Sequence, residues 1–453
     1  MKLKLHAICS FAALGSFLFG YDSGVIASTI AQKAFLARFG SPTLSDAVAG
    51  AIVSSYTGGA ILGSLSVSVL CDAYGRRAVI CLGALLATLG AALQAGAASI
   101  AMLIVGRLLA GLAVGGMSTA IPVYCSEISL PAVRGMLIST QQWMIGVGIM
   151  VAQWVGYACS LRTGDFTWRF PLGLQVIPAV VLCVGIWQLP ESPRWLIEHD
   201  GREEAGREIL VRLHGAELAE KEFQSASQKQ LSSRSTLGHF GSKEYRRILL
   251  ACGIQLFTQT SGTNMIQNYG PRLYTTLGLQ TSTSLLIIGV WGLLAVVWNT
   301  LFMLFIVDRF GRRTLLIPSL LGMACTMAVE ASLAGYYLAS SERGNNANAL
   351  RAAISMFFVF TICYTSLGLI SWIYPAEIFP TALRARGAAL ATATNWSFNL
   401  LFTQCSPLAL SHLGYKYLYC FVAFNFLAAA LVWLFFPETR GLSLDVDDHD
   451  HVQ

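Results

Sequence analysis

The chain has 453 residues, of which 55 % are apolar and only 12 % are charged. Soluble domains carry about 25 % charged residues, so a soluble fold would leave this chain with too little polar surface. A helix that crosses a bilayer needs about 20 apolar residues, so twelve need about 240, which this composition supplies. We therefore expect a polytopic all-α membrane protein whose side chains mostly face lipid or one another.

Twelve hydrophobic stretches follow one another along the chain. We expect transmembrane helices at residues 5–29, 47–70, 78–97, 100–123, 136–160, 169–189, 246–269, 284–307, 314–339, 351–375, 387–411 and 416–436. The first stretch follows Lys2 and Lys4, as in a signal peptide, but it is too long, lacks a clean cleavage site and carries Asp22. It is therefore interpreted as the first span.

The positions of Lys and Arg predict the orientation, because basic residues concentrate in cytosolic loops. With the N-terminus in the cytosol, 21 of the 30 basic residues fall on the cytosolic side and 8 on the outer side, while Arg107 lies inside a span. We therefore expect both termini in the cytosol. The net charge of +6 is then a topology signal, and we expect no nucleic-acid partner.

A long polar stretch after the sixth span divides the chain. We expect an N-terminal six-helix half at 1–189, a cytosolic linker with short surface helices at 190–245, a C-terminal six-helix half at 246–437 and a cytosolic tail at 438–453. Inside the linker, Glu and Arg at helical i,i+4 spacing predict short surface helices.

Three motifs of the first half return at matching places in the second half, which indicates a duplication. They are Asp72-x-x-x-Arg76-Arg77 and Asp308-x-x-x-Arg312-Arg313, Glu127 with Arg134 and Glu377 with Arg384, and the acids Glu191 and Glu438 in Pro-Glu-Ser and Pro-Glu-Thr. Each motif places charges at the cytosolic ends of helices, where we expect arginines to pair with acids and with helix C-termini across the seam between the two halves. We expect them to latch a cytoplasmic gate, since simple topology anchors need neither fixed spacing nor acidic partners.

The sequence contains little that points to catalysis. The eleven cysteines are scattered, and neither a C-x-x-C pair nor a Cys/His cluster occurs in the sequence, so we expect no metal site and no cofactor. A nucleophile–base pair is equally missing from the sequence, so we do not expect an enzyme. Gly111-x-x-x-Gly115 is interpreted as a helix-packing motif, because small residues let membrane helices approach closely.

The motifs together resemble the sugar porters of the major facilitator superfamily, especially the fungal branch, along nearly the whole chain. Besides the charged motifs, the residues that carry the resemblance are Gly20-Tyr21-Asp22, Gly106-Arg107, Gln141-Gln142, Gln259-x-x-Gly262-x-Asn264, Trp372 and Asn395-Trp396-x-x-Asn399. The resemblance implies two six-helix halves, a small-molecule substrate between them and, by family default, the plasma membrane.

The resemblance also implies roles for polar residues inside the spans, which are costly in lipid. The positions expected to bind a polyhydroxylated solute are Gln142, Thr258, Gln259, Asn264, Trp372, Asn395 and Asn399. Amides suit sugar hydroxyls because they offer both donors and acceptors. The family often has a second glutamine where this chain has Thr258, and an asparagine where it has Val296, so the resemblance leaves the identity of the solute open.

Asp22 and Arg107 suggest coupling to protons. Arg107 would stabilise the ionised Asp22 carboxylate, and protonation would release it. A proton-coupled importer is the leading interpretation, and a passive facilitator in which the two residues form only a structural ion pair is the alternative. An exporter of a secondary metabolite and a nutrient sensor of the same fold also remain open, as do the role of Glu330 and the oligomeric state.

Overall fold

The computed structural model describes residues 2–30, 32–40, 46–130, 133–198, 202–220, 223–224, 242–266, 281–338, 347–379 and 381–439. Within these ranges the chain is helical, without a strand. Parts of several predicted segments lie outside the described residues: 199–201, 221–222 and 225–241 of the linker, 267–269 and 339 of two spans, and 440–453 of the tail.

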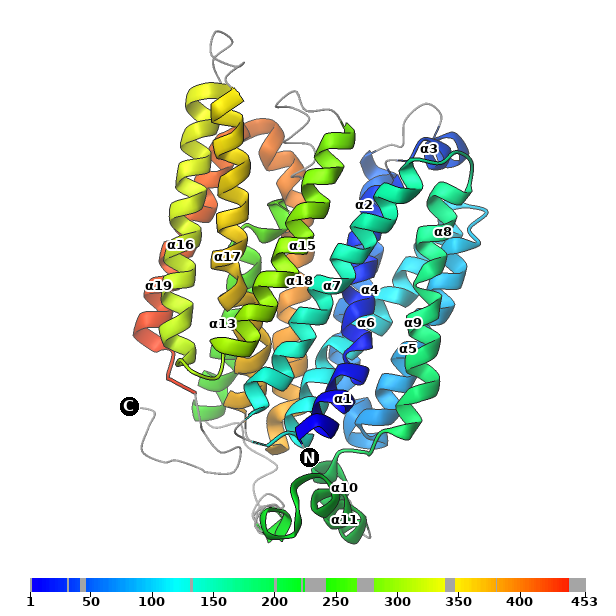
Figure 1. Ribbon diagram of the computed structural model, residues 1–453, viewed down its shortest axis with the longest axis vertical. Coiled ribbons are helices and arrows are strands. Elements are labelled where there is room, and N and C mark those ends of the chain that lie inside the picture. The colour runs from blue at the N-terminus through cyan, green and yellow to red at the C-terminus, as the bar shows by residue number, and fades with distance from the viewer. Residues whose placement is uncertain are drawn as a thin grey trace.

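Six spans form the N-terminal half, in blue to green in Figure 1. Their helices are α1 (Lys2–Ala12) with α2 (Leu14–Ile30), α4 (Asp46–Tyr74), α5 (Arg76–Ala95), α6 (Ile100–Ile128), α7 (Arg134–Ser160) and α8 (Phe166–Leu174) with α9 (Val176–Gly185) and the 3₁₀ turn η2 (Ile186–Gln188). A short helix, α3 (Lys33–Phe39), follows α2.

Six further spans form the C-terminal half. They are α13 (Ser242–Thr260), α15 (Thr281–Phe305), α16 (Arg312–Leu333) with the π-helical turn η3 (Ala334–Leu338), α17 (Ala347–Ile378), α18 (Thr381–Leu413) and α19 (Tyr417–Phe435), which the 3₁₀ turn η4 (Gly414–Lys416) precedes. Between the halves lie α10 (Pro193–Glu198) and α11 (Glu203–His214), below the bundle in Figure 1. We call this end of the bundle, where α5 and α16 begin and α10 and α11 lie, the linker end.

Ten of the described helices or helix pairs are long and apolar enough to cross a membrane, which confirms a multi-pass membrane protein. The two remaining predicted spans, in α13 and α18, run through the same bundle (Figure 1). The described part of α13 begins with the charged residues Lys243, Glu244, Arg246 and Arg247, and further along the two helices carry the polar residues Gln255, Gln259, Asn395 and Asn399. Both helices therefore place polar side chains inside the bundle, and Gln255, Gln259 and Asn395 are buried there.

Glycines let neighbouring helices touch through their backbones. A Cβ atom on Gly111 of α6 would lie 1.9 Å from the Tyr56 carbonyl oxygen of α4, and one on Gly115 would lie 2.0 Å from the Ala60 carbonyl oxygen. Such distances exclude any larger residue, so the predicted packing role of these glycines is confirmed. Likewise, a Cβ on Gly20 of α2 would lie 1.9 Å from the Ile145 carbonyl oxygen of α7.

The two halves meet along two main helix pairs. Helix α4 packs against α18, and α7 packs against α15, while α6 and α17 add further contacts across the same interface. One apolar core surrounds Tyr124 and Leu182 and extends across the interface to Trp372 and Trp396, and a second core lies around Met323 and Phe421 in the C-terminal half. Trp372, one of the residues expected to bind a solute, therefore lies within the core that joins the two halves.

Candidate functional site

A hydrogen bond between Trp372 and Gln142 joins the two halves. The indole Nε1 of Trp372 in α17 donates to Gln142 Oε1 in α7 at 2.9 Å, and Trp372 is 6 % exposed. Gly368, one turn before Trp372, makes room for this contact, because a Cβ there would lie 3.3 Å from Gln142 Nε2. Two predicted solute-binding residues from different halves are thus brought together.

Three further predicted residues meet around one amide of α13. Gln259 Oε1 accepts hydrogen bonds from Asn264 Nδ2 and, at 3.4 Å, from Asn399 Nδ2 of α18. The α13 helix ends at Thr260, and Gly262 has a φ of 94°, in the left-handed region that favours glycine. This break lets Asn264 fold back onto the last turn of the helix.

Thr258 and Asn395 connect this group to Trp372 through a residue that the sequence analysis missed. Asn395 Nδ2 donates to Thr258 Oγ1 at 2.9 Å and to Gln255 Oε1 at 2.7 Å. Gln255 Nε2 in turn donates to the carbonyl oxygen of Ser371, next to Trp372, at 2.9 Å. Gln255 lies one helical turn before Gln259, and this i,i+4 spacing was the signal that could have found it.

All seven predicted solute-binding residues therefore belong to one hydrogen-bonded network. It runs from Gln142 and Trp372 through Gln255 and Asn395 to Thr258, Gln259, Asn264 and Asn399. We call this set the amide network. A second tryptophan, Trp396 of α18, to which the sequence motif assigned no role of its own, flanks the same interface: its ring centroid lies 4.8 Å from that of Phe19 in α2, and its Nε1 lies 3.5 Å from Ser118 Oγ in α6.

Asp22 and Arg107 form a buried ion pair in the N-terminal half. Arg107 Nη1 lies 2.9 Å from Asp22 Oδ1, and the two residues are 1 % and 4 % exposed. The guanidinium has additional partners: it donates to the carbonyl oxygens of Asp22 and Ile52, at 3.2 and 3.4 Å, and lies 4.4 Å from the centre of the Tyr56 ring. Arg107 is therefore held in place by contacts that do not need a charge on Asp22.

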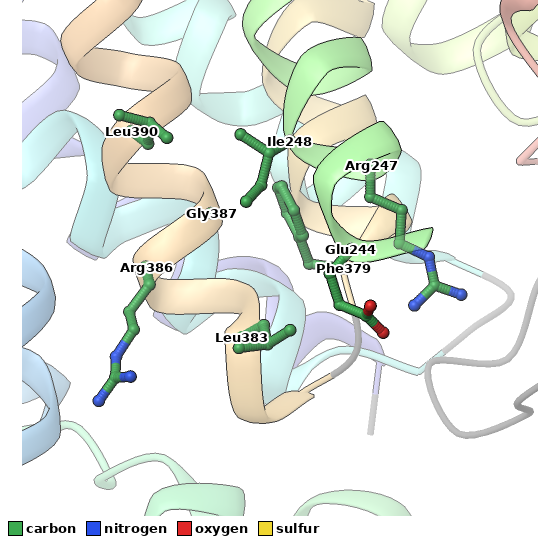
Figure 2. Close-up of a pocket in the computed structure, with 8 residues that line it drawn as sticks. All are labelled: Glu244, Arg247, Ile248, Phe379, Leu383, Arg386, Gly387 and Leu390. Atoms are coloured by element: carbon green, nitrogen blue, oxygen red, sulfur yellow. The ribbon is translucent and has the colours of Figure 1, made fainter. Parts of the chain in front are cut away.

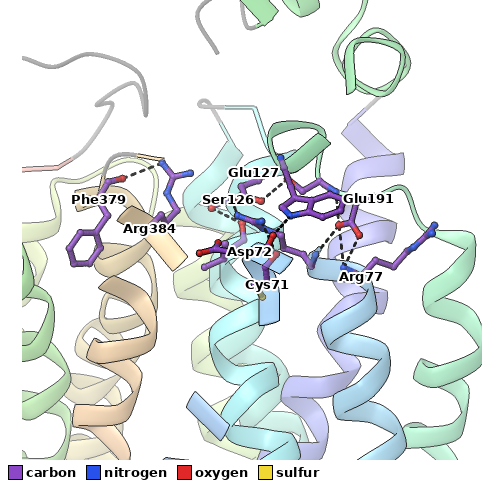
Figure 3. A network of polar contacts seen from close by, with 12 residues as sticks. Cys71, Asp72, Arg77, Ser126, Glu127, Glu191, Phe379 and Arg384 are labelled. Carbon is purple, nitrogen blue, oxygen red and sulfur yellow. Dashed lines mark hydrogen bonds and ion pairs between the residues drawn. The ribbon is translucent and has the colours of Figure 1, made fainter. Parts of the chain in front are cut away.

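The charged motifs of the N-terminal half gather at the linker end (Figure 3). Arg76 pairs with Glu127 at 2.9 Å, and Ser192 Oγ donates to the other Glu127 oxygen at 2.6 Å. The Glu191 carboxylate accepts from the backbone N–H groups of Arg76 and Arg77 at 3.1 to 3.2 Å and thereby caps α5. Burial raises the pKa of Glu191, and these backbone donors partly offset the effect.

The C-terminal half repeats this arrangement. Arg312 pairs with Glu377 at 2.9 Å, Thr439 Oγ1 donates to Glu377 at 3.0 Å, and Glu438 Oε1 accepts from the backbone N–H of Arg312 at 2.7 Å. Arg77 and Arg313, the second arginines of the two motifs, bond instead to carbonyl oxygens near the ends of η2 and α19. The motif pairs thus lie within each half rather than between the halves.

Two other contacts do cross the interface at the linker end. Asp308 Oδ2 accepts from the backbone N–H of Met136, at the start of α7, at 3.2 Å. Arg386 of α18 lies 3.8 Å from Asp72 of α4. The remaining motif residues, Arg134 and Arg384, are 4 % and 0 % exposed, and Arg384 donates to the carbonyl oxygen of Phe379 at 3.2 Å.

A pocket opens at the linker end between the starts of α13 and α18 (Figure 2). Its floor is apolar, and the side chains of Arg247 and Arg386 point away to opposite sides. None of its lining residues belongs to the amide network. A smaller cavity lies next to the network, where Gln255 and Trp372 face Pro122 and Ala388.

Two six-helix halves with a polar network between them and a buried acid–arginine pair define a secondary transporter with the major facilitator fold. The family model of the "Sugar (and other) transporter" proteins matches residues 8–448. The chain belongs to this family, the sugar porters of the major facilitator superfamily. Because the family consists of transporters, the expectation that the chain is not an enzyme is confirmed.

Similar proteins cover the whole chain. The MFS-type transporter criB of Aspergillus cristatus is 36 % identical over 100 % of this chain and 96 % of its own length. The high-affinity glucose transporter of Kluyveromyces lactis is 32 % identical over 98 % of this chain and 84 % of its own length. The solved structure of the proton:xylose symporter XylE bound to 6-bromo-6-deoxy-D-glucose superposes with a TM-score of 0.87 at 26 % identity, covering 97 % of this chain and 98 % of XylE.

The conformation is more similar to the sugar-bound XylE structure than to its inward-open form. The inward-open structure of XylE from E. coli gives a TM-score of 0.73 at 25 % identity, with the same 97 % and 98 % coverage. The contacts of Asp308 and Arg386 across the linker end agree with this difference, because they hold the halves together there.

Proposed function

We propose that this protein imports a sugar, a polyol or a related polyhydroxylated small molecule by proton symport, with alternating access. The observation that carries the proposal is the amide network, which contains groups from both halves and whose members contact one another at the interface. A solute bound there touches both halves, so its binding energy can act on their relative position.

The chemistry of the network suits hydroxyl groups. Gln142, Gln259 and Asn399 each have a carbonyl acceptor and two N–H donors, and the indole of Trp372 offers an apolar face against which a sugar ring can pack. In this conformation Gln142 is hydrogen-bonded to Trp372, and Gln259 to Asn399. The hydroxyl groups of a solute can replace these hydrogen bonds, because each hydroxyl both donates and accepts. The printed names of the similar glucose transporter and xylose symporter support this solute class.

Proton coupling is assigned to Asp22 with Arg107. The carboxylate can take up a proton without leaving the arginine uncompensated, since Arg107 keeps the two carbonyl oxygens and the Tyr56 ring. That XylE is a proton:xylose symporter supports this assignment. A passive facilitator that keeps the pair for structural reasons is the second candidate.

We further propose that the linker end faces the cytosol, as the distribution of basic residues indicates, and that the protein resides in the plasma membrane. The motif residues at that end would then form the cytoplasmic gate. In this conformation the gate is closed, with Asp308 against Met136 and Asp72 near Arg386.

The test is expression in a yeast strain that lacks its own sugar carriers, followed by uptake of labelled sugars, polyols, sugar acids and quinate-like acids, each with and without a protonophore. Saturable uptake that the protonophore abolishes is expected, and it would identify the solute. Uptake that only equilibrates and ignores the protonophore would make the protein a facilitator. Absence of uptake despite surface expression would favour an exporter or a nutrient sensor.

A further inference from the structure

Two glutamines beside the Asp22–Arg107 pair have no role in the preceding assignments. Gln94 lies on α5, and Gln175 lies at the junction of α8 and α9. They are 0 % and 2 % exposed, and none of their four amide oxygen and nitrogen atoms makes a hydrogen bond of normal geometry. Buried amides without partners are costly, so this pair needs an explanation.

Both amides lie close enough to the Asp22 carboxyl to act on it electrostatically, although in this conformation neither makes a hydrogen bond of normal geometry. Gly106, the residue before Arg107, makes the approach of Gln94 possible, because a Cβ there would lie 2.9 Å from Gln94 Cγ. Gln175 follows α8, which Tyr21 anchors through a hydrogen bond of 2.9 Å to the Pro171 carbonyl oxygen. Helices α2, α5, α6 and the α8–α9 junction thus converge on one carboxyl group.

The other groups around Asp22 are few within the described residues. Arg107 comes from α6 and Tyr56 from α4, while Tyr21 is the neighbour of Asp22 on α2 and has Cys159 of α7 close to it. Arg169 of α8 turns instead to the carbonyl oxygens of Ala95 and Ala97. Helix α5 and the α8–α9 junction therefore contribute uncharged amides to the carboxyl, and α6 contributes the charge.

We propose that Gln94 and Gln175 are positioning residues that hydrogen-bond the Asp22 carboxyl in both of its protonation states and so set the proton affinity of the coupling site. An ionised carboxylate only accepts hydrogen bonds, whereas a protonated one also donates. An amide serves both states, since its NH₂ group donates to the carboxylate and its oxygen accepts from the acid after a half-turn of the amide. A methionine, which has a similar length and shape, serves neither well.

This inference rests on the proposed proton coupling, and it predicts a pH effect of stated direction. Hydrogen bonds to a charged group are stronger than those to a neutral one, so the amides favour the ionised form. Replacing either with methionine should raise the proton affinity of Asp22 about tenfold, which moves the midpoint of the pH dependence of uptake up by about one pH unit. The solute affinity at saturating proton concentration should stay unchanged.

The experiment compares wild type, Gln94→Met, Gln175→Met and the control Gln153→Met in proteoliposomes over a series of external pH values. Gln153 of α7 also has a buried amide oxygen without a partner, but it packs against Gly292 of α15, away from Asp22. The expected result is a higher midpoint in both test variants and a wild-type midpoint in the control.

Two results would separate the possible failures. If wild-type uptake ignores the protonophore, the proposed symport fails and this inference fails with it. If wild-type uptake is proton-coupled but both variants keep the wild-type midpoint of the pH dependence, only the role of the glutamines is overturned. An amide with a purely structural role would change the yield and the thermal stability without moving that midpoint. If one methionine variant does not reach the membrane, the other methionine variant still tests the role of the glutamines. The milder variant Gln94→Asn tests it as well, because its shorter amide should shift the midpoint in the same direction.

Discussion

Asp308 of the C-terminal half accepts a hydrogen bond from the backbone N–H of Met136 in the N-terminal half. Asp72, the equivalent residue of the N-terminal half, lies near Arg386 of the C-terminal half. Met136 and Arg386 are equivalent positions, because each lies two residues after the arginine of its motif, Arg134 or Arg384. Each of the duplicated aspartates therefore contacts the opposite half at the linker end, although they use different chemical partners: a backbone N–H in one case and a guanidinium in the other.

Replacing Asp308 with alanine should favour opening at the linker end. A hydrogen bond to a charged group contributes about 1.5–3 kcal/mol, so the open population should rise about tenfold or more. The measurement is the rate at which a permeant thiol reagent labels Ala376→Cys, beside the small cavity near Trp372, in a background without reactive cysteines. Arg386→Ala is the matched comparison and should have a smaller effect, since its exposed pair at 3.8 Å contributes only about 0–1 kcal/mol. Equal labelling rates in all variants would contradict a gate at this place.

The two arginines of each motif should differ in their effect on stability. Arg76→Ala and Arg312→Ala each leave a buried carboxylate, Glu127 or Glu377, without its ion-pair partner, which costs about 3–5 kcal/mol. Arg77→Ala and Arg313→Ala remove bonds to carbonyl oxygens and, for Arg77, a contact of 4.9 Å with the Trp187 ring, but they leave no buried carboxylate without its ion-pair partner and should cost only about 1–2 kcal/mol. Thermal unfolding in detergent would show the difference, and similar melting temperatures within each pair would argue against the assigned partners.

Asp22→Asn should separate accumulation from exchange. The substitution keeps the shape of the side chain but removes its charge and its proton exchange, so uphill accumulation should disappear while solute counterflow continues. Labelled solute uptake and counterflow in the same vesicles provide the measurement. Unchanged accumulation would show that Asp22 does not carry the coupled proton.

Removing single amides from the network should weaken solute binding. Gln142→Ala and Asn399→Ala each remove a donor and an acceptor, and a loss of about 1–3 kcal/mol corresponds to a rise in KM of about 5- to 150-fold. Thr300→Val is the control: it loses a cross-half hydrogen bond of 2.7 Å from Trp143 outside the network and should keep the wild-type KM. Normal KM values in both alanine variants, at normal surface expression, would remove these residues from the binding site.

The break after α13 should tolerate no side chain at Gly262. In Gly262→Ala the Cβ would lie 2.6 Å from the Met327 methyl group, and its φ of 94° would still be unfavourable for alanine. We expect a loss of about 1–3 kcal/mol in stability together with slower transport. The double variant Gly262→Ala/Met327→Ala relieves the collision but not the backbone strain, so it should restore only part of the transport rate. Full recovery would show that the conformation of Gly262 is unimportant.

Much of the architecture could be predicted because it depends on composition and periodicity. Low charge and twelve apolar stretches indicated the bundle, and the repeated motifs indicated the two halves. The apolar pattern is weakest in α13 and α18, since these helices carry the polar network. There the resemblance to a family supplied what the apolar pattern did not.

The contacts themselves could not be predicted, because they join residues far apart in sequence. The repeated spacing of Glu127 and Arg134 marked them as one motif but did not indicate the ion-pair partner of Glu127, which in the structure is Arg76. Gln94 and Gln175 are isolated amides in the sequence, and they could be linked to Asp22 only once the structure brought α5 and the α8–α9 junction next to α2. Gln255 was within reach of helical periodicity but was not recognised.

The indole of Trp372 carries a single N–H proton, which in this conformation is given to Gln142. A sugar oxygen that accepts this proton takes it from Gln142, because one N–H cannot make two strong hydrogen bonds. Loading the site and loosening the contact between the halves would then be one event rather than two. In such a transporter the bound solute itself weakens the contact between the halves, so no additional residues are needed to couple binding to the conformational change.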